Sequence, residues 1–359
     1  MLNEELTTER KKLTFGLKTI ITIIAIILVV LGIIFVMRLV GKSSLDKPVT
    51  GDSSVVVGES TSELEENQII YDGEIYQLNE DIVSVLVMGI DFETVEEVGG
   101  QSWSAEEGSY LAGGQADSLF LAIINPHTSK VSFLAINRNA MADVDVWDEE
   151  GNYRGVQTLQ ISLQHGYGDG KEESCEHQVK AVSRMLYNIP INSYVAISMD
   201  GIPVLNDAVG GVTVNVLDDI VYPEYNMNLH KGDVVDLQGD AAYWYVRLRN
   251  ENEFGSNELR QNRQKQYLAE FMKKAREAAT SDIRVAIELY KILSDYMVTD
   301  VDLNSFTYMA TEYLDYDFDL DNIYSLDGEL INGTKFEEFY FDEDSTQKLI
   351  VDLFYEPVE

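Results

Sequence analysis

The chain has 359 residues, and its 62 acidic side chains outnumber its 26 basic ones to give a formal net charge of −36. Such acidity argues against nucleic acid as a partner, because duplex binding draws most of its affinity from neutralised phosphates. The single cysteine, Cys175, excludes an internal disulfide, and we expect an ordinary packed thiol there.

An uncharged run of Ile, Val and Leu covers residues 19–37. At about 1.5 Å per residue, it spans a hydrocarbon core of about 30 Å, and no small-residue cleavage pattern follows it. We predict an uncleaved, single-pass transmembrane anchor. Basic residues flank the run on both sides, so the positive-inside rule gives only a small preference for residues 1–18 as a cytoplasmic N-terminus. Residues 38–68 are rich in Ser, Gly, Thr and Glu and predict a flexible linker.

Three strand-like runs follow the linker, at Val83–Ile90, Ser118–Ile124 and Lys130–Ile136. The first two are almost continuously apolar, which is typical of central strands buried on both faces. Turn-forming residues at 125–129 predict that the second and third runs form a hairpin. The Gly-, Ser- and Glu-rich residues 92–116 predict a long functional or mobile loop.

The rest of the chain mixes helical and strand-like patterns. We expect helices over Glu173–Tyr187, Glu258–Ala279 and Asp282–Tyr296, strands over Tyr194–Ser198 and Val212–Val216, and a turn with positive φ at Gly210-Gly211. This mixture predicts one three-layer α/β/α domain with a central mixed sheet over residues 69–359.

One basic window interrupts the acidic chain and holds Arg247, Arg249, Arg260 and Arg263. Arg247 and Arg249 stand two apart in a strand-like run, so we expect them on one face. Arg260 and Arg263 stand three apart where a helix is predicted to begin, and helix N-termini attract anions. Guanidinium groups bind phosphate oxygens bidentately, so the window predicts a pyrophosphate clamp. Surface salt bridging in an acidic protein is the alternative.

Several motifs occur in an order shared with a known family. They are Leu86–Asp91, Gln115–Pro126, Phe133–Arg138, Val204–Val214 and the Arg-x-x-Arg-Gln of 260–264. On these motifs the chain from about residue 69 resembles a divergent member of the LytR-CpsA-Psr (LCP) family, also known as the cell-envelope-related transcriptional attenuator domain.

The resemblance implies a phosphotransferase outside the cytoplasmic membrane of Gram-positive bacteria. Such enzymes move a teichoic acid or polysaccharide from an undecaprenyl-pyrophosphate carrier onto peptidoglycan. By this analogy the catalytic residues are Asp117, Arg138 and Arg247, and the pyrophosphate-binding residues are Arg138, Arg247, Arg249, Arg260, Arg263 and Gln264. Asp117 would help hold Mg²⁺ or Mn²⁺, with Asn257 as a weak second ligand.

The chain also departs from the family pattern. The family usually has Pro-Arg-Asp where residues 137–139 read Asn-Arg-Asn, an aspartate at the position of Asn257, and Lys-Ile-Asn where residues 160–162 read Gln-Ile-Ser. An amide supplies no charge and cannot act as a base, so Asn139 and Asn257 place the metal in doubt. Glu253 and Glu258 are candidate replacements for Asn257.

These departures leave two functional hypotheses open: a glycopolymer transferase, and a catalytically impaired relative. The impaired relative would bind prenyl pyrophosphate or wall polymer as a scaffold or regulator. His165 lies beside the altered segment, and we expect either a loop residue or a member of the site.

Overall fold

The computed structural model describes residues 41–42, 45, 58, 64–65, 67–90, 113–148, 150–250, 252–318 and 320–358. The predicted cytoplasmic N-terminus, the transmembrane anchor at 19–37, most of the linker and residues 92–112 of the predicted loop lie outside them. Among the described residues, no helix combines the length and the apolar character that a bilayer span requires.

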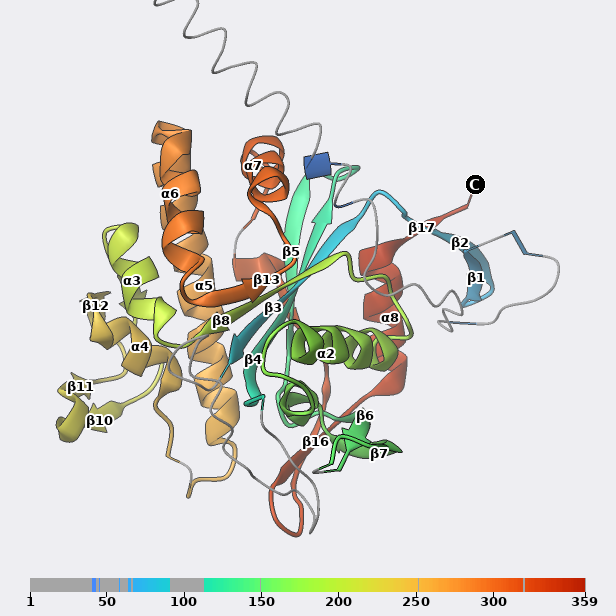
Figure 1. Cartoon of the computed structure of the whole chain (residues 1–359), viewed down its shortest axis with the longest axis horizontal. Coiled ribbons are helices and arrows are strands. Elements are labelled where there is room, and N and C mark those ends of the chain that lie inside the picture. The colour runs from blue at the N-terminus through green and yellow to red at the C-terminus, as the bar shows by residue number, and fades with distance from the viewer. Residues whose placement is uncertain are drawn as a thin grey trace, which may run out of the picture.

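A six-stranded mixed sheet forms the centre of the fold (Figure 1). In spatial order its strands are β13 (Met297–Thr299), β8 (Ser193–Ser198), β3 (Val83–Ile90), β4 (Ala116–Asn125), β5 (Lys130–Ile136) and β14 (Ile323–Ser325). The pairs β3–β8 and β5–β14 are parallel and the other three pairs are antiparallel. The predicted mixed sheet and the predicted hairpin of β4 and β5 are therefore confirmed.

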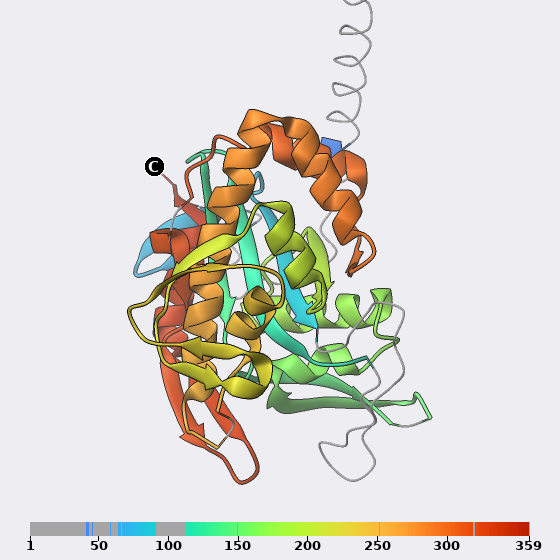
Figure 2. The same cartoon turned by 90° about the vertical axis from the view of Figure 1, so that its left-hand side faces the viewer.

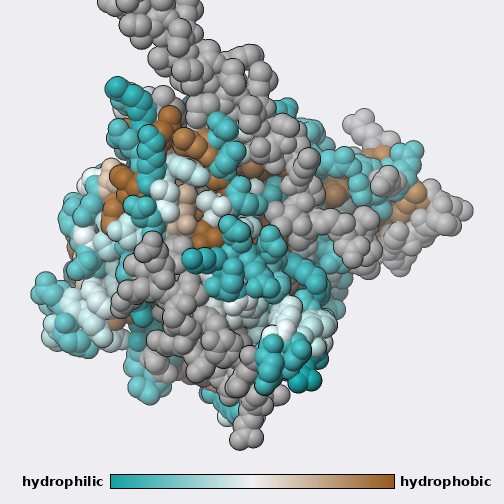
Figure 3. All heavy atoms as spheres, in the orientation of Figure 1, coloured by the Kyte–Doolittle hydropathy of each residue, from teal (hydrophilic) through white to brown (hydrophobic). Residues whose placement is uncertain are grey.

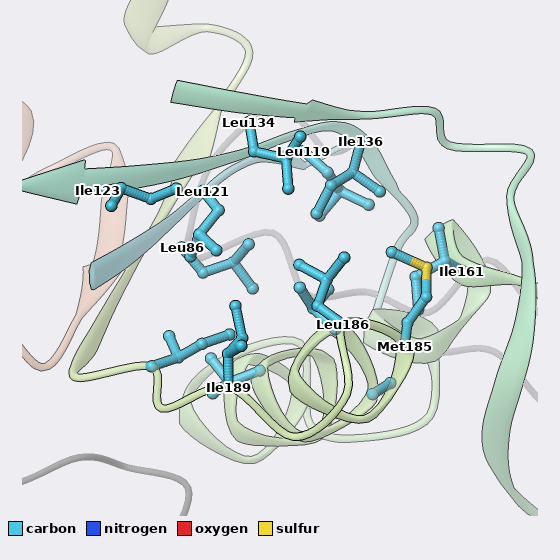
Figure 4. Close-up of a cluster of buried hydrophobic side chains, with 14 of the residues drawn as sticks. Leu86, Leu119, Leu121, Ile123, Leu134, Ile136, Ile161, Met185, Leu186 and Ile189 are labelled. Atoms are coloured by element: carbon cyan, nitrogen blue, oxygen red, sulfur yellow. The ribbon is translucent and has the colours of Figure 1, made fainter. Parts of the chain in front are cut away.

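Both faces of this sheet are buried. Leu86 and Leu121 point into the cluster beneath α2 (Glu172–Met185) and α8 (Glu343–Phe354), as Figure 4 shows for the α2 side. Their neighbours Val85 and Phe120 point the opposite way, into a cluster that includes side chains of α5 (Ser256–Ser281) and α7 (Leu303–Glu312). Alternate residues of a strand face opposite sides, so burial on both faces produces the nearly continuous apolar runs of β3 and β4.

A third hydrophobic cluster lies beside the sheet, where α3 (Gly201–Ala208), α4 (Asp240–Arg247) and two small hairpin-like pairs pack on α5 (Figures 1 and 2). The pairs are β9 (Val212–Asn215) with β12 (Val234–Leu237) and β10 (Ile220–Tyr222) with β11 (Met227–Leu229). Gly210 and Gly211 precede β9 with φ of 83° and 90°, as the sequence predicts.

The prediction of a strand around Arg247 and Arg249 is wrong, because residues 240–247 form α4 and Arg249 follows it. Its buried residues Ala242, Tyr245 and Val246 follow the i, i+3, i+4 spacing of one helix face. Aromatic and β-branched residues favour strands only where a sheet surface receives them, and here they pack on α5 instead.

The remaining elements lie around this core. They are β1 (Gln68–Tyr71), β2 (Glu74–Leu78), β6 (Met141–Trp147), β7 (Tyr153–Gln160), η1 (Ile161–Gly166), η2 (Pro223–Tyr225), α6 (Ile283–Leu293), η3 (Leu320–Asn322), β15 (Gly328–Asn332), β16 (Glu337–Phe341) and β17 (Tyr355–Pro357). The predicted helices over 173–187, 258–279 and 282–296 correspond to α2, α5 and α6 and are confirmed. The visible surface is mainly hydrophilic, with hydrophobic side chains gathered around α3 and α6 (Figure 3).

Candidate functional site

An ion-pair cluster lies where β4, β5 and α5 meet. The antiparallel register pairs Leu119 with Ile136, and it places Asp117, two residues before Leu119, opposite Arg138, two residues after Ile136. Arg138 Nη1 lies 2.6 Å from Asp117 Oδ1, and Arg260 Nη1 lies 3.7 Å from Oδ2 of the same carboxylate. Three segments that are far apart in sequence therefore converge on Asp117.

The cluster carries more positive than negative charge. Burial lowers the pKa of Arg260 to about 10, Asp117 raises it, and the neighbouring cations Arg138, Arg249 and Arg263 lower it further. Arg260 still carries its proton at neutral pH. Asp117 thus pairs with the guanidinium groups of Arg138 and Arg260, and Arg249 adds a further positive charge near Arg260, in a chain that is otherwise strongly acidic. Such a focused positive region attracts anions.

A polar cavity of about 460 Å³ opens on one side of the cluster. Arg138 and Arg249 line it together with the amides of Asn139 and Gln160 and the carboxylate of Glu337. Two exposed aromatic side chains, those of residues 254 and 336, stand at the same cavity. Glu337, which comes from β16, belongs to no motif of the sequence.

An apolar pocket of about 160 Å³ lies between β3, β4, β8, α3, α4 and α5. Side chains such as Phe120, Ile202 and Leu268 make up most of its wall, and Ser118 and Gln264 are among its few polar residues. Gln264 accepts a hydrogen bond from Ser118 Oγ at 3.4 Å and donates to the Val246 carbonyl at 3.1 Å.

The arginines lie between the pocket and the cavity. In β4, Ser118 lines the pocket while the preceding Asp117 holds the arginines. In α5, Gln264 lines the pocket and Arg260, one turn earlier, binds Asp117. After α4, Arg249 lines the polar cavity, three residues beyond Val246 of the pocket. An amphiphilic anion with an apolar tail matches this arrangement.

Two of the predicted arginines lie elsewhere. Arg263 is 2% exposed, donates to the carbonyls of Tyr245 and Leu248, and lies 3.3 Å from Asp218. It therefore joins α5 to the end of α4. Arg247 is exposed on α4, where its guanidinium lies 5.2 Å from the ring centroid of Tyr243. Neither residue lines the polar cavity.

The donor set does not by itself fit a divalent metal ion. Both oxygens of Asp117 already face guanidinium groups, and the side-chain oxygen of Asn257 accepts a hydrogen bond from Arg260 Nη2 at 2.8 Å. Glu253 and Glu258 are exposed. Within the part of the chain that the structure describes, no three His, Cys, Asp or Glu residues are grouped to hold a metal.

His165 and Cys175 form a buried pair in the core. His165 Nδ1–H donates to the Gly113 carbonyl at 2.9 Å, and Cys175 Sγ lies 3.7 Å from Nε2. Burial lowers the pKa of His165 to about 4 and raises that of the Cys175 thiol. The packed thiol is confirmed, whereas His165 lies in the buried helix η1 rather than in a loop.

The LytR_cpsA_psr family model matches residues 51–349. The chain belongs to the LytR-CpsA-Psr family. It is 27% identical over 307 residues to the polyisoprenyl-teichoic acid–peptidoglycan teichoic acid transferase TagU of Oceanobacillus iheyensis, covering 85% of this chain and 82% of that protein. It is also 27% identical over 231 residues to biofilm regulatory protein A of Streptococcus mutans, covering 62% of this chain and 51% of that protein.

Solved structures share the LCP fold. The crystal structure of Bacillus subtilis TagV superposes with a TM-score of 0.56 at 23% identity, covering 77% of this chain and 98% of TagV. The structure of TagT bound to LI-WTA gives a TM-score of 0.53 at 19% identity, covering 76% of this chain and 89% of TagT. At these identities the likeness concerns the fold alone.

In this LCP chain the amides at the unusual positions bind one another and the arginines. Asn257 Nδ2 donates to Asn137 Oδ1 at 3.1 Å, and Asn137 Oδ1 also accepts the backbone N–H of Asn139 at 3.0 Å. Gln160 Nε2 donates to Asn139 Oδ1 at 3.2 Å. The altered residues are thus integrated in one hydrogen-bond network beside the arginines.

Proposed function

We propose that this LCP protein is a membrane-anchored phosphotransferase, which transfers a wall glycopolymer from an undecaprenyl-pyrophosphate carrier to a peptidoglycan hydroxyl. The main support is the position of Arg138, Arg249 and Arg260 between an apolar pocket and a polar cavity. A lipid-linked diphosphate carries an apolar tail, a charged centre and a polar glycan in the same order. Relatives named as teichoic acid transferases support the same reaction class.

In this proposal the prenyl chain occupies the apolar pocket and the diphosphate contacts the arginines. Fixed guanidinium groups stabilise charge that develops on the transferring phosphoryl group, and they require little reorganisation during the reaction. The leaving group is the lipid monophosphate, whose charge stays close to Arg260. Gln264 and Ser118 lie at the polar end of the pocket, where the prenyl chain meets the diphosphate.

Binding of the predicted magnesium ion stays a prediction. Magnesium is commonly bound by one or two carboxylates together with substrate phosphates. Asp117 is the carboxylate nearest the arginines, and two of them already neutralise it. We therefore assign the charge stabilisation to the arginines and expect Mg²⁺ to change diphosphate affinity less than about threefold.

The test titrates the full chain, purified in detergent, with a short-chain polyprenyl diphosphate and with inorganic pyrophosphate, each with Mg²⁺ or with a chelator. A transfer assay with a lipid-linked wall precursor and peptidoglycan follows. Ile202→Trp fills the apolar pocket and should weaken binding of the polyprenyl diphosphate while inorganic pyrophosphate binds as before. Failure of the wild type to bind the polyprenyl diphosphate refutes the proposal.

A second candidate function is a binding protein without turnover. The observation that favours it is the amide character of Asn139 and Asn257, which accept and donate hydrogen bonds but supply no charge. Tight diphosphate binding without any transfer or hydrolysis would support this function over the transferase.

A further inference from the structure

The half-buried carboxylate of Glu337 enters the polar cavity from β16. Its Oε1 accepts the backbone N–H of Gly255 at 2.8 Å, and its Oε2 accepts from Asn139 Nδ2 at 3.3 Å. Gly255 is the residue immediately before α5, the helix that carries Arg260. Glu337 therefore touches the segments that hold Arg138 and Arg260.

The backbone around Glu337 is also fixed. The Glu337 carbonyl accepts from Gln160 Nε2 at 2.7 Å, and the Phe339 N–H donates to the Asn139 carbonyl at 2.9 Å. Phe339 is buried, and alternate residues of a strand share a face, so Glu337 points toward the domain while Glu338 points away. Two hydrogen bonds leave lone pairs of the carboxylate available, because an ionised carboxylate accepts at about four positions.

Charge explains why an amide stands at position 139. Asn139 presents an N–H group to Glu337, whereas an aspartate there would place a second carboxylate within hydrogen-bond distance of the first. The polar cavity thus takes the Glu337 carboxylate from β16, and the segment after β5 carries no carboxylate at residue 139. The side-chain amide of Asn139 donates a hydrogen bond to Glu337.

We propose that Glu337 accepts the proton of the acceptor hydroxyl in the transfer reaction, an inference that rests on the proposed function. With the prenyl chain in the apolar pocket, the acceptor approaches the diphosphate through the polar cavity, beside Arg138 and Arg249. The hydroxyl oxygen forms a bond to the phosphorus that carries the glycopolymer. The bond from that phosphorus to the bridging oxygen breaks, lipid monophosphate leaves, and the hydroxyl proton passes to the Glu337 carboxylate.

Other ionisable groups at the cavity fit this role less well. Glu253 is exposed, and Arg138, Arg249 and Lys335 are cations that cannot accept a proton at neutral pH. The cations also attract the anionic substrate toward Glu337. A carboxylate of this kind contributes about 10²- to 10⁴-fold to a rate when it acts as a general base.

The experiment compares Glu337→Gln with the wild type and with Glu338→Gln, a neighbouring carboxylate on the opposite face of β16. The glutamine retains an oxygen for the Gly255 N–H but turns its NH2 group toward Asn139 Nδ2, so we expect a small loss of Tm and a polyprenyl diphosphate affinity within about twofold. We expect kcat to fall about 10²-fold or more. The decline of the wild-type rate at acidic pH should be absent from the variant. Glu337→Asp should retain that decline, and Glu338→Gln should match the wild type.

The outcomes separate this inference from the proposed function. If the wild type transfers glycopolymer and Glu337→Gln keeps its kcat and its acidic decline, Glu337 is not the base and the transferase proposal stands. Parallel losses of Tm, diphosphate affinity and kcat in Glu337→Gln would overturn the inference and leave a structural role. A wild type that binds the diphosphate but never transfers it overturns both.

Discussion

Asn139→Asp tests the electrostatic relation between residues 139 and 337 directly. The new carboxylate would stand about where Asn139 Nδ2 now lies, 3.3 Å from Glu337 Oε2. At an effective dielectric constant of about 20, two charges at that separation repel by about 5 kcal/mol. Protonating one carboxyl instead costs about 4 kcal/mol at pH 7 for an ordinary pKa near 4. Because Arg138 offsets part of either cost, we expect a destabilisation of about 2–4 kcal/mol at pH 7.

The sign of the pH dependence follows from the shared proton. Repulsion raises the pKa of one carboxyl in the folded state above its unfolded value, so the penalty is absent below about pH 4 and grows as the pH rises. Urea unfolding at several pH values measures it. Asn332→Asp, which adds the same charge at an exposed position of the same cavity, should change stability by less than about 0.5 kcal/mol.

The double variant Asn139→Asp, Glu337→Gln tests whether the side chains of residues 139 and 337 interact. It restores one carboxylate and one amide donor in exchanged positions, so most of the lost stability should return. A single Asn139→Asp variant as stable as the wild type at pH 7, or a double variant no more stable than the single one, would show that the two side chains do not interact as described.

Three further predictions concern the arginines and the buried histidine. Arg249→Gln should weaken diphosphate binding about 10- to 100-fold in calorimetry, because a charge-assisted hydrogen bond is worth about 1.5–3 kcal/mol, whereas Arg247→Gln should stay within about twofold. Arg263→Ala should lower the free energy of unfolding by about 2–4 kcal/mol in urea, since two carbonyls and Asp218 lose their partner. An unchanged midpoint of urea unfolding would contradict the role of Arg263 in joining α5 to α4. The depressed pKa of His165, about 4, predicts stability that is lost as the pH falls from 6.5 toward 4, by up to about 3 kcal/mol. His165→Asn should flatten this part of the stability profile, and an equally steep profile would refute the assignment.

The central sheet could be predicted from the sequence because its signals are local. The continuous apolar runs of β3 and β4 and the turn between β4 and β5 depend on neighbouring residues only. The helix before Arg249 could not be predicted, because it depends on contacts between residues far apart in sequence. Tyr243, Trp244 and Tyr245 have strand propensity, but contacts with α5, which no local pattern records, hold them in a helix.

The candidate site could be predicted only in part. Asp117, Arg138 and Arg260 come together as the motifs suggest, while Arg263, one turn further along α5, turns into the interface with α4. Helical spacing alone does not distinguish these two arginines. Glu337 is one of 62 acidic residues, and only the docking of the β15–β16 hairpin against Asn139 separates it from the others. The apolar pocket likewise draws its wall from six separate elements.

The small sheet of β1, β2 and β17 affects how this protein can be made. Strand β17, residues 355–357, pairs with β2, residues 74–78, so the first hairpin of the described domain is completed by a strand synthesised about 280 residues later. Phe354, directly before β17, is fully buried in the main core. A nascent chain therefore cannot complete this small sheet until residues 355–357 have been synthesised. A variant without these residues lacks the third strand of the sheet. Completion of this small sheet therefore waits for the strand that is synthesised last among the described elements.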